Sequence, residues 1–417
     1  MDRIKKIPFK DYEAFARIAI KAYPPIVTPS EDAAQKFAGQ MIKQQQGDRT
    51  VTVYGLYRKQ KLLGGLRLHD FQMTMYSTIA PVGGGGLLAV DLVHKKEHVA
   101  RDLMIFFLEH FRKRGYPLAT LYPFRPDFYR QMGFGYGPRL NQFRFNPADL
   151  PPGHEKNHIV PIGKEDVAEL AKCHDRIAAR THGMMKTSNF QIERLLRPIR
   201  TMVGYRKGRR LLGYMAFTFQ PYNKDNFVSN DLVISEFLYQ DREVFHEFMA
   251  FLRSQADQVR HIVYNTFDDY FHFYPVDPRD DSDNMIAPVY HQSNVQGIGI
   301  MYRVIDIPRL FEVLKDHDFG GQTLRVKMTI ADSFLPDNAG TWVIHARKGK
   351  VKLKSSRADA DVEIKLDIAE FSSMIMGVIG FSDLYRLGLA GISDTGQVAA
   401  VDRLLFSGQK PICTAQF

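Results

Sequence analysis

The feature that most constrains the fold of this chain is an internal repeat. The run YRKQKLLG at residues 57–64 recurs, with one residue inserted, as YRKGRRLLG at residues 205–213, and each copy lies between two strand-like runs. Further along, LAVDLVHKKEHVARDLMIFFLEHFR has a counterpart in VISEFLYQDREVFHEFMAFLRSQ, and both are typical of a strand, a loop and an amphipathic helix. Two pieces that recur in the same order predict a fold that is duplicated within the chain.

The first copy predicts a mixed α/β domain over residues 1–150. Residues 51–76 favour two strands around a tight turn, and the glycine run at 83–86 favours a flexible entry into a third, buried strand. Apolar residues then repeat at spacings of three and four, which predicts a helix that ends at Gly115. A short strand follows, and after it a helical turn that glycines interrupt at residues 126–137.

The second copy predicts a related domain over residues 151–285. It ends in an aromatic and then Pro/Asp-rich stretch, residues 271–284, which is typical of a boundary loop. Asp280, Asp281 and Asp283 lie in this loop. The cluster lacks the glycine and the terminal glutamate of a calcium loop, so we expect a solvated linker there and no metal site.

The pattern changes in residues 286–417, for which we expect a third domain of α+β type. Polar and apolar residues alternate over 324–356, with turns at 336–340 and 348–350, and this predicts a β-meander. Residues 367–392 are mostly helical in pattern and unusually apolar. The expected fold class is therefore α/β (mixed α+β), with two related domains followed by a third.

Composition limits the partners and the compartment. The net charge is +10, but the Lys and Arg residues are scattered and form no arginine-rich run, so we expect no nucleic-acid partner. No stretch approaches the roughly 20 apolar residues of a membrane span, and we expect no membrane partner. Only Cys173 and Cys413 are present, and the N-terminal residues are charged throughout, so the expected location is the cytoplasm.

One loop of the first copy is suited to binding phosphate. Where a strand leads into a helix, the first N–H groups of the helix lack partners and attract anions. The loop HKKEHVA places Lys95 and Lys96 beside these groups. In the second copy, Gln240 and Asp241 occupy the equivalent positions, where a carboxylate repels phosphate. The residues alone favour the simpler interpretation, two exposed lysines at a helix start.

These residues resemble a known family. The loop from Lys95 to Ala100 is similar to the pyrophosphate loop of GNAT N-acetyltransferases, Arg/Gln-x-x-Gly-x-Gly/Ala, with His98 in place of the first glycine. Two GNAT-like domains followed by a sterol-carrier-like domain resemble, over essentially the whole chain, the Eis (enhanced intracellular survival) family. FYRQMGFGYG is similar to that family's Tyr-Gly-Arg-Phe-Gly-Tyr-Gly motif, and PICTAQF is similar to its terminal Cys-Gly-Thr-x-Phe.

The resemblance implies acetyl-CoA as co-substrate and assigns its binding residues. The pantetheine is expected along Leu88, Ala89 and Val90. The phosphates are expected at Lys95, Lys96, Glu97, His98, Val99, Ala100 and Arg101, and a second contact near Phe124 and Arg125. Phe124 departs from the family, which has a small polar residue there. No metal is implied.

The resemblance also implies the catalytic residues. The first tyrosine of the motif, Tyr129, is expected to act as general acid, because a tyrosine hydroxyl is protonated at neutral pH. The terminal carboxylate of Phe417 is expected to act as base, although a solvated α-carboxyl has a pKa of only about 3.3–3.7. From the residues alone, Tyr129 is better interpreted as a core aromatic, and the alternative for Phe417 is an anchor for the tail.

The expected function is acetyl-CoA-dependent transfer of an acetyl group to a primary amine. The family implies small-molecule acceptors such as aminoglycosides or polyamines, or lysine side chains, and a homo-oligomer, specifically a hexamer. The alternative is a non-enzymatic lipid- or partner-binding protein that uses the sterol-carrier-like domain. The net charge of +10 argues mildly against a polycationic acceptor, because long-range repulsion slows encounter.

Overall fold

The computed structural model describes residues 2–24, 30–197, 199–223 and 226–417. Its contacts form two compact units, which are described separately. The first unit comprises residues 1–137, 182–185 and 300–417, and the second comprises residues 138–181 and 186–299. The first unit therefore contains both the N-terminal α/β domain and the C-terminal α+β domain.

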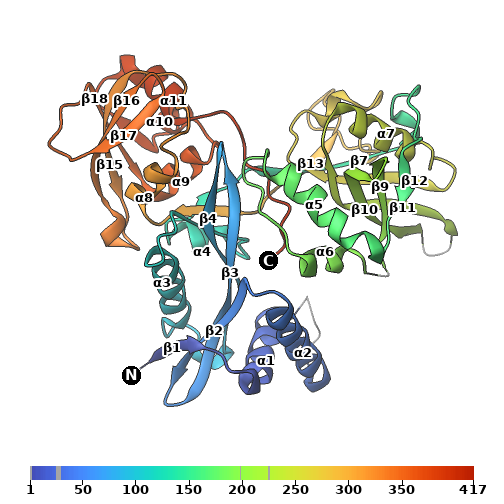
Figure 1. Cartoon of the computed structure of the whole chain (residues 1–417), viewed down its shortest axis with the longest axis horizontal. Helices are drawn as coiled ribbons and strands as arrows, with labels where there is room; N and C mark the ends of the chain where they lie inside the picture. The colour runs from blue at the N-terminus through green and yellow to red at the C-terminus, as the bar shows by residue number, and fades with distance from the viewer. Residues whose placement is uncertain (1, 25–29, 198, 224–225) are drawn as a thin grey trace. The chain divides into compact units, whose positions relative to one another are not determined.

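The first unit contains a sheet flanked by helices on both faces. Its order is β1 (Arg3–Lys6), β2 (Val51–Arg58), β3 (Lys61–Met75), β4 (Thr78–Val90), β5 (Leu118–Leu121), β14 (Met301–Val304) and β6 (Gly135–Tyr136). Figure 1 shows the long β3–β4 hairpin with α1 (Tyr12–Ala22) and α2 (Glu31–Gly47) on one side and α3 (Val99–Arg112) on the other. Successive residues of β3 point to opposite faces, so Gly64 lies against Val99 of α3 and Gly65 against Phe15 of α1.

The second unit repeats this arrangement, which confirms the predicted duplication. Its sheet has the order β8 (Ile159–Pro161), β9 (Thr201–Lys207), β10 (Arg210–Asn223), β11 (Asn226–Tyr239), β12 (Val259–Thr266), β7 (Arg139–Phe145) and β13 (Asn294–Ile298). Helices α5 (Val167–Ala178), α6 (Asn189–Leu195) and α7 (Arg242–Arg253) accompany it. In both sheets an antiparallel hairpin precedes one parallel pair, β4 with β5 and β11 with β12.

Each sheet contains one strand from the other half of the sequence. β7 follows the first domain but pairs with β12 and β13, and β14 follows the second domain but pairs with β5 and β6. The division into compact units accordingly falls between residues 137 and 138 and between 299 and 300. The expected domain boundaries, after residues 150 and 285, stay a prediction.

The expectation of a flexible glycine entry at residues 83–86 is wrong. All four glycines lie inside β4, paired with residues Arg67 to Asp70 of β3. A Cβ atom on Gly83 would lie 2.3 Å from the ring of Phe111, one on Gly84 2.3 Å from Phe71, and one on Gly85 2.8 Å from Phe107. The glycines are therefore needed because aromatic rings pack flat against the strand on both faces.

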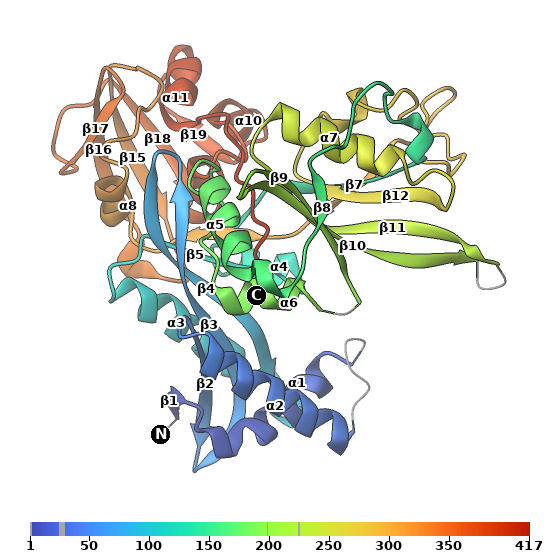
Figure 2. The same cartoon turned by 45° about the vertical axis from the view of Figure 1, so that its right-hand side comes forward.

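The third sheet confirms the predicted meander. It has the order β17 (Lys350–Lys354), β16 (Gly340–Arg347), β15 (Leu324–Ala331), β18 (Val362–Asp367) and β19 (Ala390–Ile392), and β15, β16 and β17 pair antiparallel. Its helices are α8 (Ile307–Val313), α9 (Ile368–Ile375), α10 (Phe381–Arg386) and α11 (Val398–Leu405), visible in Figures 1 and 2. Met374, Ile375 and Met376 are at most 1% exposed and pack in one core with residues of β3 and β4.

A buried ion pair ties β14 to this third domain. Arg303 and Asp332 have fully buried side chains, and Nη2 of Arg303 donates to both carboxylate oxygens of Asp332 at 2.9 and 3.0 Å. The same carboxylate accepts from the backbone N–H of Leu335 and from Nδ2 of Asn338. The buried carboxylate is thus well hydrogen-bonded, as a buried charge requires, whereas Nε and Nη1 of Arg303 are buried without a hydrogen-bond partner among the described residues.

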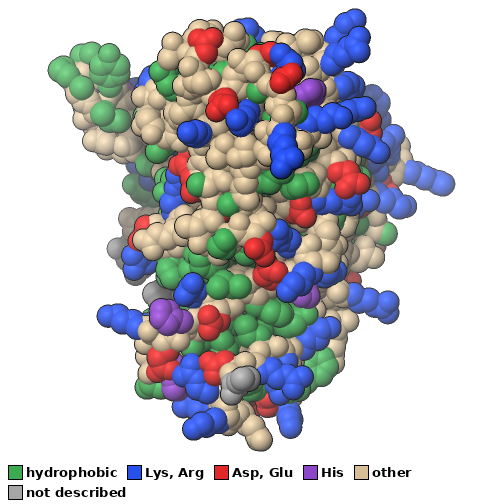
Figure 3. Space-filling model, turned by 90° about the vertical axis from the view of Figure 1, so that its left-hand side faces the viewer, with side chains coloured by type: hydrophobic (Ala, Val, Ile, Leu, Met, Phe, Trp, Pro, Cys, Tyr) green, Lys and Arg blue, Asp and Glu red, His purple; other side chains and the backbone are tan. Residues whose placement is uncertain are grey.

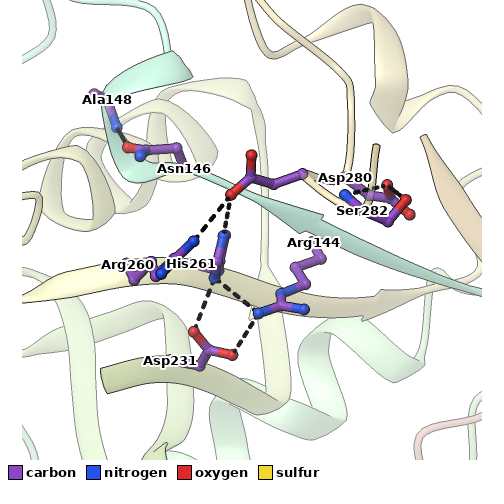
Figure 4. A network of polar contacts seen from close by, with 9 residues as sticks. Arg144, Asn146, Ala148, Asp231, Arg260, His261, Asp280 and Ser282 are labelled. Carbon is purple, nitrogen blue, oxygen red and sulfur yellow. Dashed lines mark hydrogen bonds and ion pairs between the residues drawn. The ribbon is translucent and has the colours of Figure 1, made fainter. Parts of the chain in front are cut away.

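In the second unit, the expectation of a solvated linker is wrong for one of the three aspartates, Asp280, whereas Asp281 and Asp283 are exposed. Asp280 is buried and accepts hydrogen bonds from Ser282 and Gln292. Asp281 accepts from Nε2 of the buried His261 at 2.9 Å, while Nδ1 of His261 lies 3.0 Å from Asp231 (Figure 4). These contacts fix the loop onto β12, which the sequence pattern does not reveal because its partners lie in distant segments.

The surface charge follows the composition. On the face drawn in Figure 3, Lys and Arg side chains are dispersed among Asp and Glu side chains. In the part of the chain that the structure describes, none of the helices combines the length and the apolar character needed to cross a membrane.

Candidate active site

The candidate site lies where β4 and β5 separate. The two strands pair in parallel from Val82 and Leu118 to Gly85 and Leu121. Beyond this point β4 continues to Val90, paired with β3 but no longer with β5. The strands leave a wedge at this point, with backbone groups of β4 along one side. Such a break in pairing offers a ligand the hydrogen bonds that the neighbouring strand no longer uses.

A β-bulge shapes the free part of β4. Gly65 pairs with Ala89 and Arg67 pairs with Gly86, so Leu87 and Leu88 together face the single residue between them on β3. Leu87 has a φ of 49°, a left-handed conformation that is uncommon for a leucine. Bulges of this kind re-aim backbone groups and are common beside active sites.

The bulge turns the carbonyl of Leu88 outward. The hydroxyl of Tyr23, at the end of α1, donates to this carbonyl at 2.6 Å. Ala89 is buried, and Leu88 and Val90 are partly buried. The three residues expected to pair with pantetheine therefore lie on the free edge of β4, and the carbonyl of Leu88, which already accepts from Tyr23, has a second lone pair for a ligand.

The loop after β4 leaves the start of α3 uncapped. Lys96 and His98 have φ values of 66° and 62°, and His98 occupies the N-cap position of α3 without a side-chain hydrogen bond to the helix. His98 thus adopts the left-handed conformation that glycine adopts most easily. The first N–H groups of α3 receive no side-chain cap, and Lys95 and Lys96 are exposed beside them.

The loop's acidic residue is neutralised by neighbours. Glu97 accepts from Nη1 of Arg58 at 2.5 Å and lies 3.2 Å from Nδ1 of His94. Arg58 and then His94 hold the pKa of Glu97 below its usual value. Val99 is buried in the core, Ala100 is partly buried and Arg101 is exposed. Of the seven residues expected to bind phosphate, the lysines, Arg101 and the backbone of the first turn remain available.

The second copy differs at the same position. Its helix α7 is capped by its own carboxylate, since Oδ1 of Asp241 accepts from the backbone N–H of Val244 at 3.2 Å. A negative group of the protein therefore already occupies the place where an anion would bind. This geometry agrees with the contrast between HKKEH and YQDRE in the sequence.

Tyr129 lies on α4 (Pro126–Arg130) in an aromatic cluster. It is 4% exposed, and its ring makes edge contacts with Phe124, Phe128 and Phe134 at centroid distances of 5.7, 5.2 and 6.1 Å. Burial, with a smaller contribution from Tyr23, raises the pKa of Tyr129 far above its usual value. The hydroxyl is therefore protonated throughout the physiological pH range.

The two residues expected at the second cofactor contact lie beside this cluster. Phe124 is 54% exposed and its ring contacts Tyr23 and Phe128. Arg125 is exposed and its guanidinium pairs with Asp127 at 2.5 Å. An exposed pair of this kind contributes at most about 1 kcal/mol, so a phosphate can compete for the arginine.

Phe417 reaches the wedge from the far end of the sequence, as Figures 1 and 2 show at the position marked C. Its ring contacts Phe71, Tyr122 and His69 at centroid distances of 4.9, 5.2 and 5.5 Å. A Cβ atom on Gly86 would lie 3.1 Å from the carboxyl carbon of Phe417 and 3.6 Å from Nη2 of Arg67. The carboxylate thus lies over Gly86 and beside a guanidinium.

The tail before Phe417 is held by a short segment from the middle of the chain. The backbone N–H of Ile412 donates to the carbonyl of His182 at 2.8 Å, and residues 183 and 184 hydrogen-bond to Thr74 of β3. His182 itself is buried: Nδ1 accepts from the N–H of Tyr76 and Nε2 donates to the carbonyl of Met376. His182 therefore has a structural role.

Together these residues enclose a cavity of about 280 Å³. Both Tyr129 and Phe417 line it, with Leu88 of the predicted pantetheine edge and Phe124 of the predicted second contact. Tyr23, Arg67 and Tyr122 also line it, and none of them was predicted from the sequence. Tyr122 could have been predicted as a site residue, because it directly follows the strand β5. Arg67 could not, because no motif or periodicity near it indicates a site.

Three family models match the chain. A GNAT acetyltransferase domain matches residues 3–137, a second GNAT acetyltransferase domain matches residues 179–304, and a sterol carrier protein domain matches residues 311–414. The predicted order of two GNAT-like domains and a sterol-carrier-like domain is confirmed, and so is the prediction of an acetyltransferase enzyme. A comparison with curated proteins finds no significant match.

Solved structures show the same fold over the whole chain. A GCN5-related N-acetyltransferase from Anabaena variabilis has a TM-score of 0.80 at 15% identity, and a probable N-acyltransferase from Enterococcus faecalis has 0.79 at 18%. Eis1 from Mycobacterium abscessus has a TM-score of 0.78 at 16% identity. In each case 100% of both chains is covered. At such low identity these likenesses establish the fold and the domain order.

Proposed function

We propose that this tandem GNAT acetyltransferase, with its C-terminal sterol carrier protein domain, transfers the acetyl group of acetyl-CoA to a primary amine in the cavity of its first domain. One observation carries the proposal. Tyr129 and Phe417, which come from the first and the last segment of the first unit, line the same cavity at the open end of the β4–β5 wedge.

The residues of the wedge fit acetyl-CoA. The free edge from Leu88 to Val90 supplies backbone groups for an amide-rich chain such as pantetheine. The uncapped start of α3, with Lys95, Lys96 and Arg101, supplies N–H groups and positive charge for a pyrophosphate. When bound, acetyl-CoA supplies a thioester whose acetyl carbon is open to attack by an amine.

Phe417 and Tyr129 provide the two proton positions that the reaction needs. We assign the Phe417 carboxylate to accept the proton that the attacking amine loses, directly or through water. We assign the Tyr129 hydroxyl to donate a hydrogen bond to the sulfur as the carbon–sulfur bond breaks. The pKa of Tyr129 lies above that of a thiol, which is about 8.5. Tyr129 therefore acts mainly by stabilising the negative charge that develops on the sulfur, and it does not transfer its proton before the carbon–sulfur bond breaks.

The remaining assignments follow the resemblance. We propose that the second GNAT domain binds no acetyl-CoA, because Asp241 caps its helix. We propose a cytoplasmic homo-oligomer, specifically a hexamer, and a primary amine as acceptor, for which the resemblance suggests aminoglycosides, polyamines or lysine-type amines. A lipid- or partner-binding role of the sterol carrier protein domain without catalysis is the alternative that the following experiment also addresses.

The experiment measures thiol release from acetyl-CoA with a panel of amines. We expect Tyr129→Phe and a chain extended by three residues beyond Phe417 to lose at least 100-fold in kcat, which corresponds to about 2.7 kcal/mol of transition-state stabilisation. We expect Lys95→Glu with Lys96→Glu to raise the KM for acetyl-CoA, whereas Lys352→Glu, an exposed charge reversal in the third domain, changes neither constant. Full activity of the extended chain would remove the carboxylate from the mechanism.

If the wild-type protein shows no saturable acetyl-CoA binding, the enzyme assignment fails and the lipid- or partner-binding alternative takes its place. If it binds acetyl-CoA but Tyr129→Phe retains full activity, only the assignment of Tyr129 is wrong. Isothermal titration with desulfo-CoA measures binding without turnover and separates these cases.

A further inference from the structure

We propose that the acceptor is a monoamine with an apolar, preferably aromatic, body, and that amines with several positive charges are poor substrates. The proposal rests on the acetyltransferase function proposed above and narrows its primary-amine acceptor to a class that excludes the aminoglycosides and polyamines that the resemblance suggests. Three features of the cavity carry it: its charge, the position of Arg67 and the nature of its walls.

The cavity offers a cationic acceptor very little negative charge. Among the residues that the structure describes, no Asp or Glu side chain lines it. Its one anionic group is the terminal carboxylate of Phe417, which the reaction itself uses. An alkylammonium has a pKa of about 10.4, so every amine of a polyamine that does not react enters the site charged. A charge that leaves water without a partner costs far more than a neutral group of the same size.

Arg67 makes this imbalance larger. Its Nη2 atom and the Phe417 carboxyl carbon lie within 4 Å of the same point above Gly86. Its Nη1 atom donates to Oε1 of Gln44 at 3.0 Å, which directs the guanidinium along the cavity side of β3. Among the described residues, the fixed charges that line the cavity are thus one guanidinium and one carboxylate, both close to Gly86. A second ammonium on the acceptor meets the guanidinium without a further carboxylate to balance it.

The walls are suited to an apolar body. Five aromatic side chains line the cavity, namely those of Tyr23, Tyr122, Phe124, Tyr129 and Phe417. The Tyr122 hydroxyl already donates to the carbonyl of Ala415 at 3.2 Å, and that of Tyr23 to Leu88 at 2.6 Å. These two rings therefore present mainly their carbon surface to a ligand. Aromatic walls favour flat apolar groups and tolerate a single amine through its contact with ring faces.

The test compares amines of equal length that differ in charge. At saturating acetyl-CoA, we expect kcat/KM for hexylamine to exceed that for 1,6-diaminohexane at least tenfold, and 2-phenylethylamine to be at least as good as hexylamine. We expect kanamycin and spermidine to be the poorest of the panel. Equal or higher kcat/KM for 1,6-diaminohexane than for hexylamine would overturn the proposal.

A charge introduced at the rim provides the second arm. Phe124 is 54% exposed, so a polar side chain is tolerated there. We expect Phe124→Glu to raise the ratio of kcat/KM for 1,6-diaminohexane over hexylamine at least fivefold, and the uncharged isostere Phe124→Gln to leave this ratio within twofold of wild type. A ratio that is the same in both variants would contradict the charge argument.

The acetyltransferase function and the acceptor class can be refuted separately. If acetyl-CoA binds but no amine of the panel releases thiol, the acetyltransferase function itself is in error. If thiol is released fastest with spermidine or kanamycin, acetyl transfer stands and only the acceptor class is wrong.

Discussion

Replacing Phe417 by alanine separates the ring of this residue from its carboxylate. The variant keeps a terminal carboxylate but loses three aromatic contacts, with Phe71, Tyr122 and His69. If the ring fixes the carboxylate over Gly86, activity falls although both catalytic groups are still present. If the carboxylate is placed by the backbone of the tail alone, activity is unchanged.

The magnitude follows from the contacts. Burying a phenylalanine side chain contributes about 1.5–3 kcal/mol, and each aromatic pair adds about 0.5–1.5 kcal/mol. Because the residue is only partly buried, we take about 2–4 kcal/mol for the docking of the ring. At about 1.4 kcal/mol per factor of ten, the docking equilibrium of the last residue changes by about 30- to 1000-fold.

We expect kcat/KM to fall at least tenfold in Phe417→Ala, measured by thiol release with the best amine. The melting temperature should change little, because Ile412 keeps its hydrogen bond to His182 and holds the rest of the tail. Phe417→Leu keeps apolar volume but loses the aromatic pairs, so its kcat/KM should lie between the values of the wild type and of Phe417→Ala. A Phe417→Ala enzyme within twofold of wild type refutes the reasoning that the ring positions the carboxylate.

Three further predictions test other parts of the structure. Gly86→Ala places a Cβ atom 3.1 Å from the Phe417 carboxyl carbon and should lower kcat at least tenfold with an unchanged KM for acetyl-CoA; Gly297→Ala, a strand glycine in open space, is the control and should leave kcat unaltered. Asp332→Ala leaves Arg303 buried without its counterion and should cost about 3–5 kcal/mol in urea unfolding; a loss below 1 kcal/mol contradicts the importance of the pair. Burial lowers the pKa of His182 to about 4 from 6.5, so the unfolded chain takes up a proton first as the pH drops. The free energy of unfolding should not depend on this group above pH 6.5 and should fall by about 3 kcal/mol between pH 6.5 and pH 4. It should fall less in His182→Asn over the same interval, and an equal fall in both proteins would contradict the lowered pKa of His182.

The repeat predicted the fold well because it encodes local structure. The strands, the turn at residues 58–61 and the helix α3 follow from periodicities that lie within a few residues of one another. The exchange of β7 and β14 between the sheets could not be predicted in this way. Strand order depends on contacts between segments more than 100 residues apart, and nothing in the short strand Met301–Val304 marks its partner.

The glycine run shows how the same residues support opposite readings. Four successive glycines are usually flexible, but here Phe71, Phe107 and Phe111 pack against three of them from the two faces of the strand. The helix that carries two of these rings was predicted, but its distance from the strand was not. The site shows the same limit: Tyr129 and Phe417 were predicted through a family motif, whereas Arg67 has no sequence signal and is found only from its position beside Gly86.

The placement of β14 has a consequence for synthesis of the protein. β5 belongs to the first domain, yet its neighbour on one side is made only after the whole second domain. At about 5–20 residues per second, the ribosome needs roughly 10–30 s to advance from the end of β6 to the end of β14. During that time β5 is an open edge that can pair with other chains. Nascent chains of this protein should therefore depend on chaperones until residue 304 emerges, and an isolated N-terminal fragment should aggregate rather than fold.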